Sequence, residues 1–284
     1  MQDKLAEFIR IPSVSDDIDQ VHRALDFVLR LGGELGFEAR TCADGQVGVI
    51  EWKASESGIA GSSAVNPTAV TETLGILCHV DVVPPGPLDE WKTDPFEPVI
   101  NEGRMYGRGT LDDKGMVIAA LFAMKAASDI GQVRGGKPYK NVRLIIGTQE
   151  EVSWVDMDQY VKTEPLPDYG FTPDGEFPVQ NIEKGIADYE FEFDAKGCEI
   201  TAGTAINSIP SKASVKLPGG EIFEAVGKTC HSSEPDRGDN AFFNLGKVLA
   251  AREAAARAAQ IISEFEKAFG DGFGRNLPIY KETE

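Results

Sequence analysis

The sequence predicts an α/β protein, with a mainly parallel sheet carrying helices on both faces, followed by a smaller α+β domain. Two short apolar runs, 74–78 and 142–147, have the composition of strands buried on both faces. Between them, residues 114–127 are rich in Ala, Leu, Met and Ile, which favours a helix packed on that sheet. Beyond about residue 188 the apolar pattern alternates, which is typical of half-buried antiparallel strands. We therefore expect two domains, 1–187 and 188–284.

Local patterns predict the remaining elements. Apolar residues recur at helical spacing over 17–35, and Asp16 and Asp17 are typical of a helix start. Residues 47–52 have the composition of a strand, whereas 55–73 is rich in Ser, Gly, Ala and Thr and is predicted to be an exposed loop. Downstream we expect two half-buried strands and one long helix with an Ala-rich centre, at 189–193, 213–217 and 240–269.

Composition excludes several classes of partner. The 284-residue chain carries 46 acidic and 28 basic residues and a formal net charge of −18. Nucleic acids and anionic membranes both bind basic patches, so neither is expected as a partner. The N-terminus lacks a signal-peptide pattern, and the apolar runs are too short for a membrane span. The four scattered cysteines show no C-x-x-C spacing, which favours a reducing cytoplasm.

Three polar clusters lie where the predicted strands and the helix meet their loops, and a fourth lies in a later loop. In an open α/β sheet, ligands bind beyond the carboxyl ends of the strands, so these clusters are expected to converge. One imidazole among several carboxylates is a ligand set suited to zinc, manganese or cobalt. The clusters are His79-Val80-Asp81, Asp112-Asp113, Glu150-Glu151 and Pro173-Asp174-Gly175.

Spacing within two clusters suggests separate roles. Asp81 lies two residues after His79, where its carboxylate can accept the ring N–H that does not face a metal. Adjacent side chains point in different directions, so one of Glu150 and Glu151 can bind a metal while the other acts as general base towards a metal-held water.

Each cluster also has a structural explanation when it is taken alone. A histidine after a strand is commonly a satisfied structural residue, and Asp112-Asp113 before a helix is commonly a capping pair. Glu150-Glu151 is typical of a solvated face, and Asp174-Gly175 of a turn. Only the joint placement of the clusters favours a metal site over these alternatives.

Four ordered stretches carry a resemblance to a known family. The chain resembles the metallopeptidase M20 family, and within it the PepV-like (Sapep-type) dipeptidases. The resemblance implies a zinc-aminopeptidase-like catalytic domain over 1–187, incomplete at its C-terminal part, and a partial lid or dimerisation-like domain over 188–284. The stretches are 75–84 (Gly-Ile-Leu-Cys-His-Val-Asp-Val-Val-Pro), 106–115 (Tyr-Gly-Arg-Gly-Thr-Leu-Asp-Asp-Lys-Gly), Glu150-Glu151, and 171–178 (Phe-Thr-Pro-Asp-Gly-Glu-Phe-Pro), the last running on to Glu183-Lys184-Gly185.

The resemblance implies a role for each acidic cluster. His79 and Asp174 would bind one metal, and Asp112, followed by a cis peptide bond, would bridge to a second metal bound by Glu151. Glu150 would act as general base and then as proton donor to the leaving amine. Asp81 would orient His79. Two divalent ions are expected, with zinc first and manganese or cobalt as alternatives.

Two stretches of the second region, 204–210 and 227–241, are similar to the lid signatures of the family. The resemblance implies that His231 contacts the scissile carbonyl or the substrate carboxylate, and that Asn240 helps to hold the substrate. Without the family pattern, His231 has the features of an ordinary surface-loop histidine.

The chain also departs from the family pattern. The family completes its second metal site with a histidine far towards the C-terminus, but this chain has only His22, His79 and His231. We therefore expect a shortened member of the family, in which the site of Asp112 and Glu151 lacks one protein ligand.

The expected function is metal-dependent hydrolysis of the peptide bond of dipeptides, through a metal-bridging water activated by Glu150. Two alternatives stay open: a deacylase or desuccinylase acting on N-acyl amino acids, and a shortened metal-binding chain without turnover. A small peptide is the expected partner. Self-association is also expected, because a shortened sheet exposes an edge and apolar surface.

Overall fold

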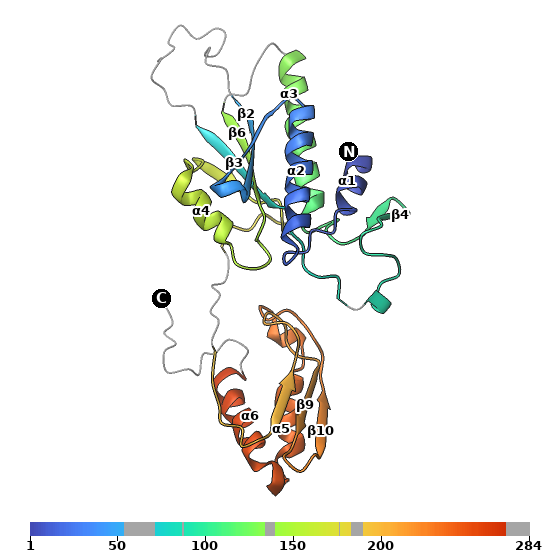
Figure 1. Cartoon of the computed structure of the whole chain (residues 1–284), viewed down its shortest axis with the longest axis vertical. Coiled ribbons are helices and arrows are strands. Elements are labelled where there is room, and N and C mark those ends of the chain that lie inside the picture. Colours follow the sequence, from blue (N-terminus) through green and yellow to red (C-terminus); the bar gives the residue numbers. More distant parts are fainter. Residues whose placement is uncertain (54–71, 87, 134–139, 176, 183–189, 271–284) are drawn as a thin grey trace. The chain divides into compact units, whose positions relative to one another are not determined.

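The computed structural model describes the chain in six stretches, which form two compact units, Met1–Val179 and Gln180–Glu284 (Figure 1). The boundary predicted near residue 188 falls within 183–189, outside the described residues. Outside them also lie most of the predicted 55–73 loop and the Glu183-Lys184-Gly185 extension. The described stretches are 1–53, 72–86, 88–133, 140–175, 177–182 and 190–270.

A five-stranded sheet forms the centre of the first unit, in the order β1-β2-β6-β3-β7. β3 pairs in parallel with β6 and β7, whereas β2 pairs antiparallel with β1 and β6. The expected α/β class is confirmed, but the sheet is mixed and not mainly parallel. The strands are β1 (Glu38–Cys42), β2 (Val47–Trp52), β3 (Thr73–His79), β6 (Asn141–Gly147) and β7 (Tyr169–Phe171).

The connections explain the mixed sheet. A short turn, η1 (Ala43–Gly45), joins β1 to β2, and a connection of this length permits only antiparallel pairing. Parallel pairing requires a crossover, which α3 (Lys114–Val133) supplies between β3 and β6. α4 (Val155–Thr163) supplies the crossover between β6 and β7.

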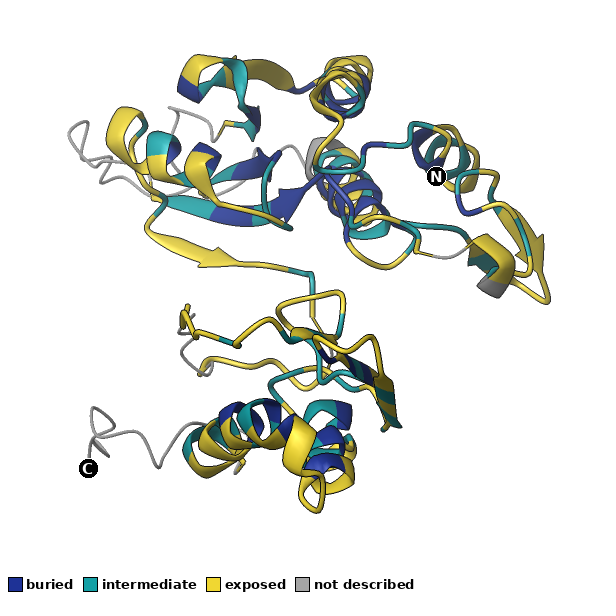
Figure 2. Cartoon of the chain, turned by 60° about the horizontal axis from the view of Figure 1, so that its bottom comes forward, coloured by how far each residue is buried: buried dark blue, intermediate teal, exposed yellow. Residues whose placement is uncertain are grey.

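Helices cover both faces of this sheet, as expected. α2 (Ile18–Glu34) and α3 lie side by side on one face and α4 lies on the other (Figure 1). Alternate residues of β6 point to opposite faces, so Leu144 packs under α2 and α3 while Ile145 packs with Tyr160 of α4. The central strands β2, β6 and β3 and the inner helix faces are mostly buried, whereas the edge strands β1 and β7 and the outer helix faces are mostly exposed (Figure 2).

The N-terminal part of the chain packs around this core. α1 (Gln2–Ile9) contacts α3, and Phe8 stacks on Phe27 of α2 with ring centroids 5.1 Å apart. Asp17 caps α2, because its side chain accepts a hydrogen bond from the Gln20 amide. The loop between β3 and α3 holds η2 (Leu88–Glu90) and a small hairpin of β4 (Val99–Asn101) and β5 (Arg104–Tyr106).

The second unit is an antiparallel sheet, in the order β10-β9-β8, with two helices that share its core. The predicted strand at 213–217 is confirmed as β9 within one residue at each end. Among the described residues of both units, no helix is long and apolar enough to cross a membrane. The elements are β8 (Glu199–Ala202), β9 (Lys212–Lys216), β10 (Ile222–Val226), η3 (Pro235–Arg237), α5 (Ala241–Leu249), η4 (Glu253–Ala255) and α6 (Ala256–Phe269).

Two predictions for this unit were wrong. The single helix expected over 240–269 is broken, with Arg252 in an extended conformation between α5 and α6. A continuous helix of that length would be about 45 Å long and could not bury both halves on one three-stranded sheet. The break lets α6 pack on α5, where Gly246 lies so close to Ile262 that a Cβ on Gly246 would sit 2.7 Å from its Cγ2.

The strand expected at 189–193 also does not form in its described residues, 190–193. Its alternating aromatic residues pack on α6, with the rings of Phe191 and Phe193 centred 5.6 Å and 5.2 Å from the ring of Phe265. Side-chain packing on a helix therefore replaces the strand pairing that the alternation suggested.

Candidate metal centre

The polar clusters meet at the carboxyl ends of the three parallel strands. β3 ends at His79, which pairs with Gly147 at the end of β6, three residues before Glu150. β7 ends three residues before Asp174, and Asp112 stands just ahead of α3. The convergence that the sequence predicted for these clusters follows from the parallel pairing of β6, β3 and β7.

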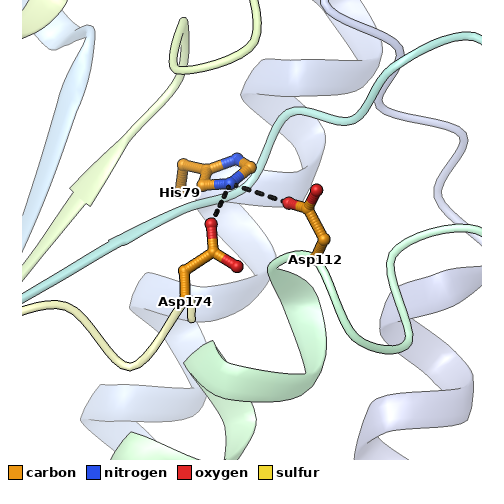
Figure 3. A group of neighbouring side chains, drawn as sticks. All are labelled: His79, Asp112 and Asp174. Atoms are coloured by element: carbon orange, nitrogen blue, oxygen red, sulfur yellow. Dashed lines mark ion pairs between the residues drawn. The ribbon is translucent and has the colours of Figure 1, made fainter. Parts of the chain in front are cut away.

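His79 is the centre of this group. Its side chain is buried, and its Nε2 lies 3.1 Å from Asp112 Oδ1 and 3.4 Å from Asp174 Oδ2 (Figure 3). Glu150 Oε2 lies 3.8 Å from the same nitrogen. The ring nitrogen therefore faces carboxylate oxygens from three separate segments of the chain.

The other ring nitrogen fixes the tautomer of His79. Nδ1 lies 2.9 Å from the main-chain oxygen of Asp81 and 3.3 Å from its Oδ1. Both atoms are acceptors, so Nδ1 carries a proton in either protonation state of the ring, and Nε2 is the nitrogen whose lone pair a metal ion would take. The sequence predicted this orienting role for the Asp81 carboxylate, but the closer acceptor is the main-chain oxygen of Asp81.

The Asp81 carboxylate is fully buried and joins two of the clusters. It accepts hydrogen bonds from the main-chain amides of Glu150 and Glu151, each at 3.2 Å, and from Ser15 Oγ at 2.8 Å. Burial alone would raise its pKa, but the bonds from His79, Ser15 and the Glu151 amide outweigh burial and lower the pKa. Asp81 therefore stays ionised beside the His79 ring.

Asp113 supports the centre from the main-chain side. The Asp112–Asp113 peptide bond is cis, as the resemblance implied. Asp113 is buried, and its Oδ2 accepts a hydrogen bond from the His79 amide at 2.9 Å. Burial raises the pKa of Asp113 to about 7. Sequence reasoning gave this carboxylate no role of its own, because nothing in the Asp-Asp pattern indicates a bond to a strand end.

The electrostatics of the cluster favour a bound cation. Burial lowers the pKa of His79, but the carboxylates of Asp112, Asp174 and Asp81 outweigh burial and raise the pKa well above its usual value. Burial and neighbouring carboxylates raise the pKa of Glu151 to about 7, and burial also raises that of Glu150. Closely spaced carboxylates thus take up protons unless another positive charge offsets their repulsion.

The residues present fit a divalent metal ion. Among the described residues, His79 Nε2 and Glu151 Oε1 are buried atoms that meet no well-aligned hydrogen-bond partner. The His79 Nε2 atom faces the carboxylates of Asp112 and Asp174. Ligand atoms of His79, Asp112 and Asp174 lie within 4.8 Å of one another. Ligand atoms of His79, Glu150 and Glu151 also lie within 4.8 Å of one another, whereas the family resemblance assigns Glu151 and Asp112 to one metal. An imidazole with carboxylates suits zinc, manganese or cobalt.

Two predicted site residues belong to the second unit. His231 is exposed, and its Nδ1 lies 2.7 Å from Ser233 Oγ and accepts a hydrogen bond from the Ser233 amide at 3.2 Å, so Nε2 is the ring nitrogen that carries a proton and is open to another group. Asn240 caps α5, because its side-chain oxygen accepts a hydrogen bond from the Phe242 amide at 3.0 Å. This capping leaves the Asn240 amide NH₂ as the group that can contact a ligand.

Residues 75–269, which include all of these clusters, match the sequence model of the peptidase family M20/M25/M40. The chain belongs to this family. A Bacillus subtilis (strain 168) relative, named "Putative dipeptidase YtjP", is 33% identical over 327 residues, covering 98% of this chain and 65% of the relative. A "Putative dipeptidase" of Staphylococcus aureus (strain N315) is 32% identical over 253 residues, covering 75% of this chain and 53% of the relative.

Solved structures of M20 peptidases are also similar to the chain. The M20 family metallo-carboxypeptidase Sso-CP2 from Sulfolobus solfataricus has a TM-score of 0.46 at 26% identity, over 59% of this chain and 36% of that chain. Human carnosine dipeptidase 1 has a TM-score of 0.47 at 24% identity, over 61% of this chain and 38% of that chain. The chain thus spans 65% or less of the length of the relatives named here.

Proposed function

We propose that the chain carries the metal centre of a hydrolase that cleaves the peptide bond of dipeptides. The observation that supports this most directly is the buried Nε2 of His79, which faces the carboxylates of Asp112 and Asp174 and meets no well-aligned hydrogen-bond partner among the described residues. Membership of the M20 peptidase family and the dipeptidase names of the two curated relatives support the reaction class.

The proposed ligands divide into two groups. His79, Asp174 and Asp112 would hold one divalent ion. By the family resemblance, Asp112 would also serve a second ion, held by Glu151, with zinc as the first candidate and manganese or cobalt as alternatives. Such ions, when bound, polarise a substrate carbonyl and lower the pKa of water. The buried, unpartnered oxygen of Glu151 supports its place as a ligand.

Glu150 is the proposed general base. Its carboxylate lies beside the ligand atoms, and burial raises its pKa, which suits a group that must take and return a proton near neutral pH. Glu150 takes one proton from the attacking water as the water oxygen bonds to the carbonyl carbon. The C–N bond then breaks, and Glu150 passes that proton to the leaving amine nitrogen.

His231 and Asn240 are proposed as substrate contacts. The tautomer of His231 supports this role, because the Ser233 amide occupies Nδ1 and leaves the Nε2 proton available to an oxyanion or a carboxylate. The four cysteines, all free thiols, support a reducing location such as the cytoplasm.

The test is hydrolysis of a small dipeptide panel containing β-alanyl and ordinary L,L pairs, with zinc, manganese or cobalt added and with a chelator control. We expect cleavage that the chelator abolishes. Glu150→Gln should lower kcat by about 10²–10⁴-fold, because it removes the base and keeps the shape of the side chain. Glu34→Gln, an exposed change on α2, should leave kcat unchanged.

Two results would contradict the proposal. One is a folded, metal-loaded protein that cleaves no member of the panel. The other is cleavage that persists in Glu150→Gln at the rate of the Glu34→Gln control.

A further inference from the structure

The segment that joins α1 to α2 pairs with the residues that follow His79. Val14 and Val82 form a parallel β-bridge, in which the Val82 amide donates to Ser13 O at 2.9 Å and the Ser15 amide donates to Val82 O at 3.1 Å. The chain from Ser13 to Ser15 therefore runs beside the first metal-ligand segment, more than sixty residues away in sequence.

Within this pairing, Ser15 makes a contact that the backbone bridge does not require. Its Oγ lies 2.8 Å from Asp81 Oδ2. Among the described residues, three other donors reach this carboxylate, and all are farther away: His79 Nδ1 at 3.3 Å and the amides of Glu150 and Glu151 at 3.2 Å. Ser15 thus makes the shortest contact to the group on which both ligand clusters depend.

We propose that Ser15 is a positioning residue of the metal centre, acting through Asp81 on His79 and on the Glu150–Glu151 turn. This inference rests on the metal site of the proposed function. An ionised carboxylate only accepts hydrogen bonds, so the Ser15 hydroxyl must donate to it. That donation fixes the rotation of the Asp81 carboxylate, and the rotation sets the direction in which each oxygen meets the ring and the two amides.

Removal of the hydroxyl has a definite structural consequence. Of the donors in the described part of the chain, Oδ2 of Asp81 would keep the Glu151 amide at 3.2 Å, while Oδ1 keeps His79 and the Glu150 amide. The carboxylate could then rotate towards the donors of Oδ1, which are His79 and the Glu150 amide. The turn that carries Glu151 would then lose its fixed distance from His79. Groups that orient metal ligands typically change metal affinity by about 10–100-fold when they are removed.

Ser13 provides a matched control on the same segment. Its buried hydroxyl donates to the main-chain oxygen of Val80 at 2.6 Å and, unlike that of Ser15, makes no bond to the Asp81 carboxylate. Ser13→Ala should therefore weaken the pairing of the segment, and with it the melting temperature, without releasing the Asp81 carboxylate.

The experiment measures Co²⁺ binding to the full chain by competition with a chromophoric chelator, together with the visible spectrum of the bound Co²⁺. Ser15→Ala should raise the Co²⁺ Kd about tenfold or more and alter the spectrum. Ser15→Thr, which restores a hydroxyl, should return Kd to within about threefold of the wild type, and Ser13→Ala should stay within the same range.

The inference is overturned if Ser15→Ala binds Co²⁺ as tightly as the wild type, or if Ser13→Ala loses as much affinity, since general loosening of the segment would then be the cause. Wild-type protein that binds no Co²⁺ would overturn both this inference and the proposed function. Tight Co²⁺ binding by a wild type that cleaves no dipeptide would refute the proposed reaction alone and leave the role of Ser15 to be decided by its own variants.

Discussion

Asp174→Asn separates the charge of the proposed metal centre from its shape. Asp174 Oδ2 lies 3.4 Å from His79 Nε2, and its side chain is 30% exposed, so an amide fits in its place. The substitution leaves His79 and Asp112 as the remaining ligands of the first group. We expect this single change to remove most of the stabilisation that a divalent cation gives the folded protein.

The size of the effect follows from linkage. A cation at 100 times its Kd stabilises the folded state by about 2.7 kcal/mol. For a unit of the size of Met1–Val179, each kcal/mol shifts the melting temperature by about 2–4 °C, so the wild type should gain about 5–10 °C. If the lost carboxylate weakens binding about 100-fold, the same cation concentration leaves only about 0.4 kcal/mol, or roughly 1 °C.

Differential scanning calorimetry with zinc or manganese, and with excess chelator, measures both shifts. Asp19→Asn, an exposed acid-to-amide change on α2, should keep the full shift of the wild type and controls for net charge. An Asp174→Asn protein that gains as many degrees as Asp19→Asn would show that the cation binds elsewhere. A wild type that gains none would show that the cluster does not bind it.

Two further predictions follow from buried charges. Arg143→Met should lower the free energy of unfolding by about 3 kcal/mol in urea titrations. The Glu51 carboxylate, whose side chain is only 13% exposed, would lose the Arg143 guanidinium nitrogen that lies 2.7 Å from it. A loss below about 1 kcal/mol would contradict this. In chelator, the free energy of unfolding should fall as pH rises from about 4.5 to about 7. The reason is that folding raises the pKa of Glu151 from 4.5 to about 7, so the folded state binds this proton more tightly than the unfolded chain does. Saturating metal should flatten this decline, and urea midpoints that rise with pH in chelator would refute the assignment.

The parts of the fold that the sequence predicted well are those whose signals are local. The strand expected at 47–52 is β2 residue for residue, and the helix expected over 17–35 is α2 with Asp17 as its cap. Both depend on a short apolar pattern and on a capping side chain, which act within a few residues of one another.

The errors came where packing between distant segments overrides local preference. The Ala-rich stretch 250–259 has high helix propensity, yet the chain turns there because α5 and α6 bury Leu245 and Ile262 in one core. The antiparallel half of the first sheet depends on the length of the turn at 43–45, which apolar periodicity does not reveal.

The same distinction applies to the metal centre. Three of its clusters could be proposed from sequence because each follows a recognisable strand or precedes a recognisable helix, whereas Asp174 stood in a loop after β7, a three-residue strand that the sequence did not predict. Ser15 and Asp113 could not, since their partners Asp81 and the His79 amide lie 66 and 34 residues away. An orienting residue close in sequence to its ligand, such as Asp81, can be predicted from spacing, whereas one from a distant segment is visible only in the folded structure.

The division of the chain makes the proposed metal binding and the proposed turnover separately testable. The five proposed ligand and base residues all lie in Met1–Val179, whereas the proposed substrate contacts, His231 and Asn240, lie in Gln180–Glu284. Because each unit has its own hydrophobic core, a change confined to the second unit removes no ligand from the metal cluster. Affinity for a cation is therefore the property that tests the first unit, and the hydrolysis rate at saturating cation is the property that tests His231 and Asn240.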